Sequence, residues 1–177
     1  MVIDGKEDKQ YDGLWEGTLI RFSPDSKRVA YNARVGKEGF VVIDGKKEYG
    51  IDLGLSNPIF SPDSKRVAYE ALVHHRDCVF VDGKEVMALS DVFGPLLFSP
   101  DSQHIAWVNT MMVIEQDEKG KELRSRHEYF VVMDGKEGKQ YDGFLEGVRI
   151  IFDSPHTFHY LAIKESNNIY LVEEKIQ

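Results

Sequence analysis

The chain of 177 residues is poor in cysteine and lacks any long apolar run. Cys78 is single, so no intrachain disulfide can form, and we expect it to be a small core residue in a strand. A bilayer-spanning helix needs a run of about 18 or more apolar residues, and none occurs. The opening letters, MVIDGKEDKQ, do not resemble a secretory signal, which favours a cytoplasmic location.

An excess of basic charge is also missing. Lysine and arginine number 22 against 30 aspartates and glutamates, which leaves a net charge of −8. The lysines are scattered along the chain and do not gather in one segment. Nucleic acid and anionic membranes are therefore not expected as partners.

Catalytic signatures are absent as well. The chain has no G-x-S-x-G, no H-E-x-x-H, no glycine-rich phosphate loop and no spaced cysteine pair, so we expect neither an enzyme nor a cofactor. His74 and His75 are adjacent, and neighbouring residues of a strand point to opposite faces, so they form a poor metal chelate. His156 and His159 lack an evident third ligand, and no metal site is expected.

What the sequence does contain is a repeat. FSPDSKRVAY occupies 22–31 and recurs unchanged at 60–69, and FSPDSQHIAW fills 98–107. A second landmark follows each copy: VVIDGK at 41–46, FVDGK at 80–84 and VVMDGK at 131–136. A fourth, eroded unit reads RIIFDSPHTFHYLA and then NIYLVEEK. Self-similarity at this period indicates a solenoid, a propeller or an array.

Short strands separated by turns are expected within each unit. Segments such as TLIRF, RVAYNA and FVVI are rich in β-branched and aromatic residues and are too short for helices. Pro24, Pro62 and Pro100 preset φ in a turn, and Asp44-Gly45 and Asp82-Gly83 suit two-residue hairpins. This turn role also explains the repeated aspartates without any bound cation. Each unit thus reads as four antiparallel strands.

The repeated phrase resembles the FSPDGKxIAY repeat of TolB-like and other WD-repeat-like β-propellers. The resemblance covers nearly the whole chain and implies an all-β fold in which each unit is one propeller blade. It implies a fold and not an activity, since propellers host many functions. The chain departs from the family at Ser26, Ser64 and Ser102, where the family has glycine. If that position is left-handed, each serine costs about 1 kcal/mol.

The boundaries predicted for one propeller domain over 1–177 are repeat units at about 14–53, 54–91, 92–144 and 145–177, with a closing strand in 1–13. The N-terminal strand would complete the last blade, because the C-terminal segment ends after a third strand. KQYDGLWEG at 9–17 and KQYDGFLEG at 139–147 agree at seven of nine positions, as equivalent outer strands should. Three arrangements stay open: a four-bladed ring, an eight-bladed ring of two chains, or a fragment of a larger propeller.

The third unit contains an insertion of fourteen residues, predicted to be a lengthened hairpin over about 108–128. Seven more residues per strand extend a hairpin by about 23 Å. Thr110, Met112 and Ile114 point one way and Met111 and Val113 the other, and a free two-stranded arm with apolar residues on both faces is marginal in water. We expect partner contacts at Met111, Met112, Val113, Ile114 and Leu123, most simply with a second copy of the chain. The arm could instead fold back over its own ring.

The function expected from these features is that of a noncatalytic binding or scaffold propeller that contacts another protein or itself, as a homodimer. The alternative is a propeller that binds a small molecule or carbohydrate through the aromatic residues near the Asp-Gly turns: Tyr11, Trp15, Tyr141 and Phe144. A hydrolase or lyase remnant is a third reading.

Overall fold

The fold was analysed in a computed structural model, which describes residues 2–3, 5–7, 11–51, 57–74, 76–89, 91–92, 94–145, 149–165 and 168–176. The chain divides into two compact units, residues 1–88 and 89–177, and each contains two of the repeat units. Every regular element among the described residues is a β-strand. No helix in that part of the chain is long and apolar enough to cross a membrane.

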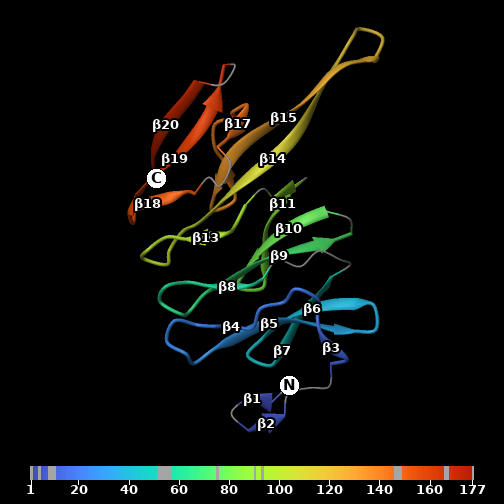
Figure 1. Ribbon diagram of the computed structural model, residues 1–177, viewed down its shortest axis with the longest axis vertical. Coiled ribbons are helices and arrows are strands. Elements are labelled where there is room, and N and C mark those ends of the chain that lie inside the picture. The colour runs from blue at the N-terminus through green and yellow to red at the C-terminus, as the bar shows by residue number, and fades with distance from the viewer. Residues whose placement is uncertain are drawn as a thin grey trace. The chain divides into compact units, whose positions relative to one another are not determined.

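The N-terminal unit contains a short hairpin and two larger antiparallel sheets (Figure 1). The strands are β1 (Val2–Ile3), β2 (Lys6–Glu7), β3 (Gly13–Leu14), β4 (Arg21–Phe22), β5 (Val29–Val35), β6 (Glu38–Ile43), β7 (Lys46–Ile51), β8 (Ile59–Phe60), β9 (Val67–Val73), β10 (Arg76–Val81) and β11 (Lys84–Leu89). β4 to β7, with β3, form the first sheet, and β8 to β11 form the second.

The C-terminal unit contains the third and fourth sheets. The strands are β12 (Asp91–Val92), β13 (Leu97–Phe98), β14 (Ile105–Gln116), β15 (Glu122–Met133), β16 (Lys136–Glu137), β17 (Gly143–Phe144), β18 (Ile151–Ser154), β19 (Thr157–Lys164) and β20 (Asn168–Lys175). The third sheet comprises β12 to β16, and the fourth comprises β17 to β20.

Each repeat unit forms one sheet, and its strands pair in sequence order. β4–β5–β6–β7, β8–β9–β10–β11 and β13–β14–β15–β16 are equivalent, and β18–β19–β20 follows the same order. The prediction of an all-β chain built from four propeller-type repeat sheets is confirmed. β1 pairs with β2 in the register of β15 with β16, so residues 2–7 form the end of a blade-like hairpin. Closure of the last blade by this segment would join the two units and stays a prediction.

Two turns define each of the first three repeats through the same hydrogen bonds. In the first copy the Ser23 hydroxyl donates to Asp25 (2.7 Å) and accepts from the Arg28 N–H (2.9 Å). The Asp44 carboxylate accepts from the Val29 N–H (2.9 Å) and from the Arg28 guanidinium (2.8 Å). Asp44 and Gly45 both have positive φ, at 50° and 73°, as a type I′ hairpin requires.

The second and third copies repeat these contacts. Asp82 accepts from the Val67 N–H and from the Arg66 guanidinium, and Asp134 accepts from the Ile105 N–H and faces the His104 ring. The aspartates of the Asp-Gly turns therefore hold the sheet together in addition to forming turns. The serine after each SPD is left-handed, with φ of 60° at Ser26, 67° at Ser64 and 66° at Ser102, so the turn type does not avoid the strain.

Within the N-terminal unit, side chains of the first sheet reach the second. The Arg28 guanidinium lies 5.2 Å from the centre of the Phe60 ring and donates to the Lys65 carbonyl at 2.6 Å. The Asp25 N–H donates to the Ser64 hydroxyl at 3.0 Å. A serine at this position therefore supplies a bond between sheets that a glycine could not.

Two of the hydrophobic clusters among the described residues lie between neighbouring sheets of one unit. In the N-terminal unit, Ala30, Val41 and Ile43 of the first sheet pack with Val67, Tyr69, Ala71, Cys78 and Phe80 of the second. In the C-terminal unit, Ala106, Val108 and Val131 of the third sheet pack with Tyr141, Ile150, Phe158, Tyr160 and Ala162 on the side of the fourth. Cys78 is buried in its strand, as the sequence predicts.

Candidate functional site: the β14–β15 arm

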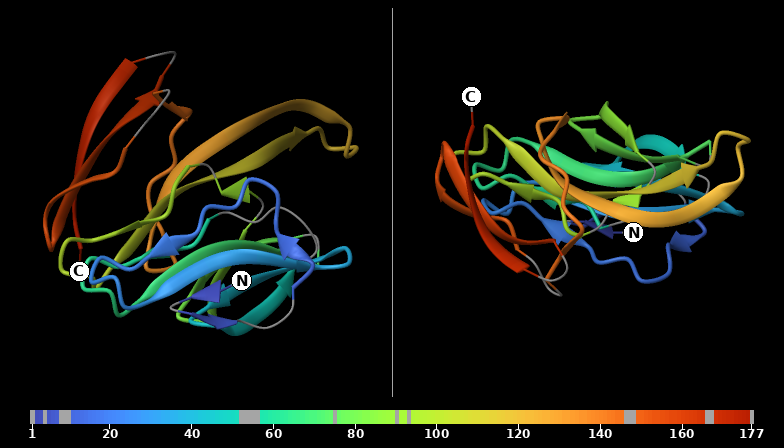
Figure 2. Two further views of the ribbon diagram at one scale, coloured as in Figure 1. Left: turned by 60° about the horizontal axis from the view of Figure 1, so that its bottom comes forward. Right: turned by 90° about the horizontal axis from the view of Figure 1, so that it is seen from above.

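The longest strands of the chain, β14 and β15, form a hairpin that extends well beyond the other strands of the third sheet (Figures 1 and 2). They pair from Ala106 opposite Met133 to Gln116 opposite Glu122. Asp117 closes the tip: its carboxylate accepts from the N–H groups of Lys119 and Lys121, both at 2.9 Å. The two strands are thus paired up to the tip, with one register shift between Glu115 and Gln116.

The base and the outer part of this hairpin differ in burial. Residues 105–110 are buried, and β12 pairs there with Asn109 and Thr110. On β15 the last contact of this kind is the pairing of Tyr129 with Tyr141, in which each main-chain N–H donates to the other residue's carbonyl. Residues 111–128 therefore form the projecting part, which we name the arm.

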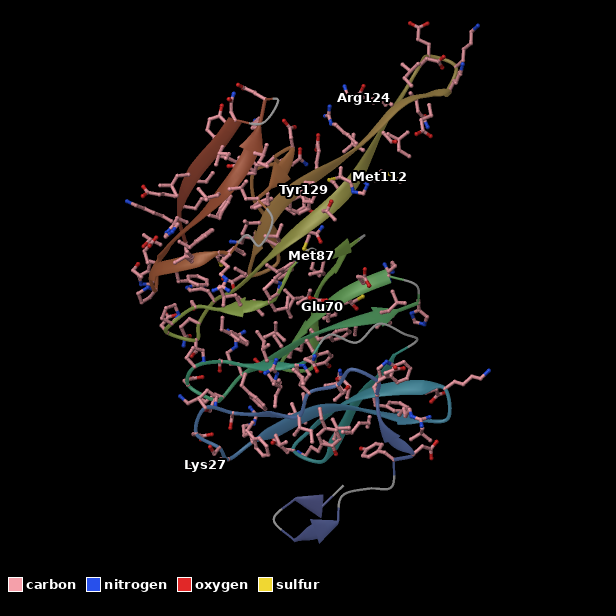
Figure 3. The ribbon with its side chains drawn as sticks, viewed as in Figure 1. Lys27, Glu70, Met87, Met112, Arg124 and Tyr129 are labelled. Atoms are coloured by element: carbon pink, nitrogen blue, oxygen red, sulfur yellow. The ribbon has the colours of Figure 1, made fainter. Side chains whose placement is uncertain are left out.

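One face of the arm is apolar and exposed. Met112, Ile114 and Leu123 expose 57%, 44% and 65% of their surface. Met112 lies opposite His127 and Ile114 opposite Ser125 in the register. Ser125 and His127 share a face with their partners Ile114 and Met112, and Leu123, two residues before Ser125 on β15, follows on the same strand next to the register shift near the tip. We call these five residues the arm face; Figure 3 shows Met112 between Tyr129 and the outer part of the hairpin.

The opposite face of the arm is held by ion pairs. Arg126 donates to Glu115 at 3.1 Å and to Glu128 at 2.7 Å, and the bond to Glu128 raises the pKa of the guanidinium. Val113 lies opposite Arg126 and is half-buried, as is Met111, whose sulfur accepts from the Gln140 amide at 3.8 Å. Of the five residues predicted to contact a partner, Met112, Ile114 and Leu123 thus share the open face, while Met111 and Val113 lie on the ion-paired one.

The four aromatic residues predicted to bind a ligand occupy different surroundings. Tyr141 and Phe144 pack around Tyr160, with ring centres 5.9 Å and 5.4 Å from it. Tyr11 packs on Tyr31 and lines a cavity of about 280 Å³ together with Gly13, Leu14 and Ala33. Trp15 is half-buried beside β5, and its main-chain N–H donates to the Asn32 carbonyl. Ligand binding by these residues stays a prediction.

Two histidines of the C-terminal unit pair with aspartates of their own sheets. His104 lies 2.6 Å from Asp134, and His159 lies 2.8 Å from Asp153. Among the described residues, no group of three or more histidine, cysteine, aspartate or glutamate side chains is placed to hold a metal ion. His74 is in a turn with a φ of 50°, and His75 lies outside the described residues.

Two features of the surface were missed by the sequence reasoning. The ion pairs of Arg126 could have been found from the opposite charges that meet when the arm is written as a hairpin. The other is the exposed apolar side of β20, where Ile169 and Leu171 lie. The run IYLV, apolar at every position, was the signal, because a strand with one solvated face normally alternates.

No protein-family model matches the chain, and no curated protein matches it. Solved structures similar to it include an acylaminoacyl peptidase of Pyrococcus horikoshii, with 17% identity and a TM-score of 0.47, over 85% of this chain and 30% of the peptidase. The β-propeller domain of the Trilobed protease from Pyrococcus furiosus is 13% identical, with a TM-score of 0.40, over 88% of this chain and 69% of that domain. The Dos1 propeller is 12% identical, with a TM-score of 0.35, over 93% and 59%. The chain thus spans less than a third of the peptidase, and at these TM-scores the likenesses carry no argument about function.

Proposed function

We propose that this protein is a noncatalytic propeller-type scaffold that acts through protein–protein contacts and associates with a second copy of itself through the arm face. The observation that supports the proposal is the exposure of Met112, Ile114 and Leu123 on a hairpin that projects from its sheet. An apolar surface that stays in water lowers the stability of an isolated two-stranded ribbon, and a partner that covers it removes this cost.

A second copy suits this surface because none of the five residues of the arm face is an aspartate, glutamate, lysine or arginine; the nearest carboxylate on this side is that of Glu122, opposite Gln116 at the tip. Ser125 and His127 are its polar members, and the charged Glu115, Arg126 and Glu128 contact one another on the other side. Two arm faces can therefore meet about a twofold axis at Met112, Ile114, Ser125 and His127 without bringing carboxylates together there. Methionine side chains are common at such contacts because their flexibility lets them fit the surface of a partner.

Mass in solution tests this proposal. The variant Met112→Thr, Ile114→Thr, Leu123→Thr keeps residues that suit strands but makes the arm face polar. We expect the wild type to be a dimer whose mass falls on dilution, and this variant to be a monomer at every concentration, by light scattering coupled to size exclusion.

The matched control changes the other face of the same strand, with Met111→Thr and Val113→Thr. It should keep the wild-type dimer, because these side chains lie against the ion pairs and Gln140. A wild-type protein that is monomeric throughout, or a polar-face variant with unchanged mass, would contradict self-association through the arm.

A further inference from the structure

The fourth sheet has an exposed apolar face, whereas the equivalent faces of the first and third sheets are buried. Ile169 and Leu171 on β20 expose 58% and 61% of their surface, and Leu161, opposite Leu171 on β19, exposes 39%. Leu161, Leu171, Ile163 and Ile169 lie on one side, since Leu161 pairs with Leu171 and Ile163 with Ile169. We name this surface the outer face of the fourth sheet.

The register of the third sheet shows what such a face contacts. Trp107 lies opposite Val132 in the third sheet, and Tyr160 lies opposite Val172 in the fourth. Counting outward from these pairs, Leu161 is equivalent to Val108, Leu171 to Val131 and Ile169 to Tyr129. Val108, Val131 and Tyr129 of the third sheet contact the fourth. The residues that they meet there are Tyr141, Phe144, Tyr160 and Ala162.

The surface that receives these residues is repeated near the N-terminus. KQYDG at 139–143 recurs unchanged at 9–13. Asp142 and Asp12 make the same main-chain bond to the neighbouring strand, to the Ile163 carbonyl and the Arg34 carbonyl, both at 2.9 Å. Phe144 pairs with Ala162, and Leu14 pairs in the same way with Ala33. The first sheet therefore carries a second version of the receiving surface.

The two versions differ in how they are filled. In the C-terminal unit Phe144 stacks on Tyr160, and Tyr129 lies 6.3 Å from the Phe144 ring. In the N-terminal unit Leu14 exposes 41% of its surface, and a cavity of about 280 Å³ lies beside it and Tyr11. A cavity of this size next to an exposed leucine leaves room for side chains as large as Ile169 and Leu171.

We propose that the outer face of the fourth sheet docks on the first sheet of a second copy, with Ile169 and Leu171 packed against Leu14 and into the cavity beside Tyr11. The contact reproduces the packing of the third sheet on the fourth, with Ile169 in the place of Tyr129. Each copy carries both surfaces, so each member of a pair of copies holds a surface that the other can receive. The choice of a second copy as the occupant rests on the proposed self-association, but the residues are separate from the arm face.

Cross-linking between distinguishable copies tests the contact. One copy carries Ile169→Cys and the other, with a different tag, carries Leu14→Cys; Cys78 is buried and stays in both. After mixing and a short bismaleimide treatment, we expect about tenfold more heterodimer than from Ile169→Cys with Lys27→Cys, because docking raises the effective concentration of the two thiols. Lys27 is a suitable control because its side chain is 81% exposed in a turn of the same sheet.

Each result decides the proposal. A yield no higher than with the Lys27 control overturns it. A second result also overturns the proposal. In it, a chain that carries both Ile169→Cys and Leu14→Cys is cross-linked within itself, while the mixed single variants are not cross-linked to each other. Repeating the mixture with Met112→Thr, Ile114→Thr, Leu123→Thr in both copies separates the two surfaces: heterodimer that persists supports docking of the sheets even if the arm proposal fails. Far-ultraviolet circular dichroism checks that every variant is folded.

Discussion

The SPDS turns of the first three repeats and the corresponding turn of the fourth repeat occupy the same position in their sheets but are held by different hydrogen bonds. In the first three repeats, the serine hydroxyl donates to the aspartate of the same turn. The aspartate of the Asp-Gly turn accepts from the first N–H of the strand that follows the SPDS turn. In the second copy the Ser61 hydroxyl donates to Asp63 and lowers its pKa to about 2. That stabilisation is present above the ordinary aspartate pKa and is lost as pH falls toward 2.

The fourth turn has replaced this set with a smaller one. Between the paired residues Phe152 and Phe158 lie five residues, 153–157, whereas six, 23–28, lie between Phe22 and Val29. Asp153 now contacts His159 of the adjacent strand, and no Asp-Gly turn caps β19. The SPDS residues therefore occur in the repeats in which an Asp-Gly carboxylate links the start of one strand to the end of another.

The largest effect on stability is expected from the loss of an Asp-Gly carboxylate. Asp82→Ala removes the acceptor of the Val67 N–H and of the Arg66 guanidinium and leaves an alanine at a φ of 53°. We expect a loss of about 3 kcal/mol in the free energy of unfolding, from an unsatisfied N–H and a left-handed alanine. Urea denaturation measures it.

The control for this substitution is Asp153→Ala in the fourth sheet. It breaks an exposed contact with His159 alone, so the loss should stay below about 1 kcal/mol. Equal losses in the two variants would mean that the carboxylate link is not what distinguishes the repeats.

How far sequence predicts this molecule depends on whether a feature is local. Pro24 and Asp44-Gly45 specify turns by backbone chemistry, so the four strands of each repeat could be predicted. Arg28 is different, because its bond to the Lys65 carbonyl and its place over Phe60 require the position of the next sheet. The recurring pair of a basic residue and an aspartate sixteen residues later, as in Arg28 and Asp44, was an available signal for part of it.

The candidate site follows the same division. The length of the insertion predicts a hairpin, and the alternation of Met111 to Ile114 predicts two apolar sides. Which side is open depended on Arg126, since its ion pairs with Glu115 and Glu128 cover the side of Val113. Side-chain partners across a hairpin follow from its register, and a bulge at Glu115 and Gln116 shifts that register near the tip.

A second prediction compares one position in neighbouring repeats. Glu70 stands where the other sheets have Asn32, Val108 and Leu161; burial, with Asp77 nearby, raises its pKa to about 7. The folded state therefore binds this proton more tightly than the unfolded chain does, so stability is greatest below the ordinary glutamate pKa and falls as pH rises to 7.

Glu70→Gln should remove that loss. We expect the variant to be more stable than the wild type by about 3 kcal/mol at pH 8 and equal to it near pH 4. Thermal unfolding across this pH range measures the difference. Glu118→Gln, at the exposed tip of the arm, should follow the wild type at every pH. A Glu70→Gln variant whose advantage does not grow with pH would show that folding does not raise the pKa of the Glu70 carboxyl.

The smallest predicted effect concerns the serine that follows SPD in the first and second repeats. Ser26 and Ser64 have the same left-handed backbone, but Ser26 is exposed, whereas Ser64 is buried and accepts the Asp25 N–H from the preceding sheet. Ser26→Gly relieves strain without losing a contact and should stabilise the fold by up to about 1 kcal/mol. Ser64→Gly relieves the same strain but leaves the Asp25 N–H without its acceptor, which costs about 1 kcal/mol or more, so the net change should be zero or a loss. Urea denaturation of the two variants side by side compares strain with the bond between sheets. If Ser64→Gly stabilised the protein as much as Ser26→Gly, the bond would contribute nothing, and the departure from glycine at this position would have no structural cause in the contact between the first and second sheets.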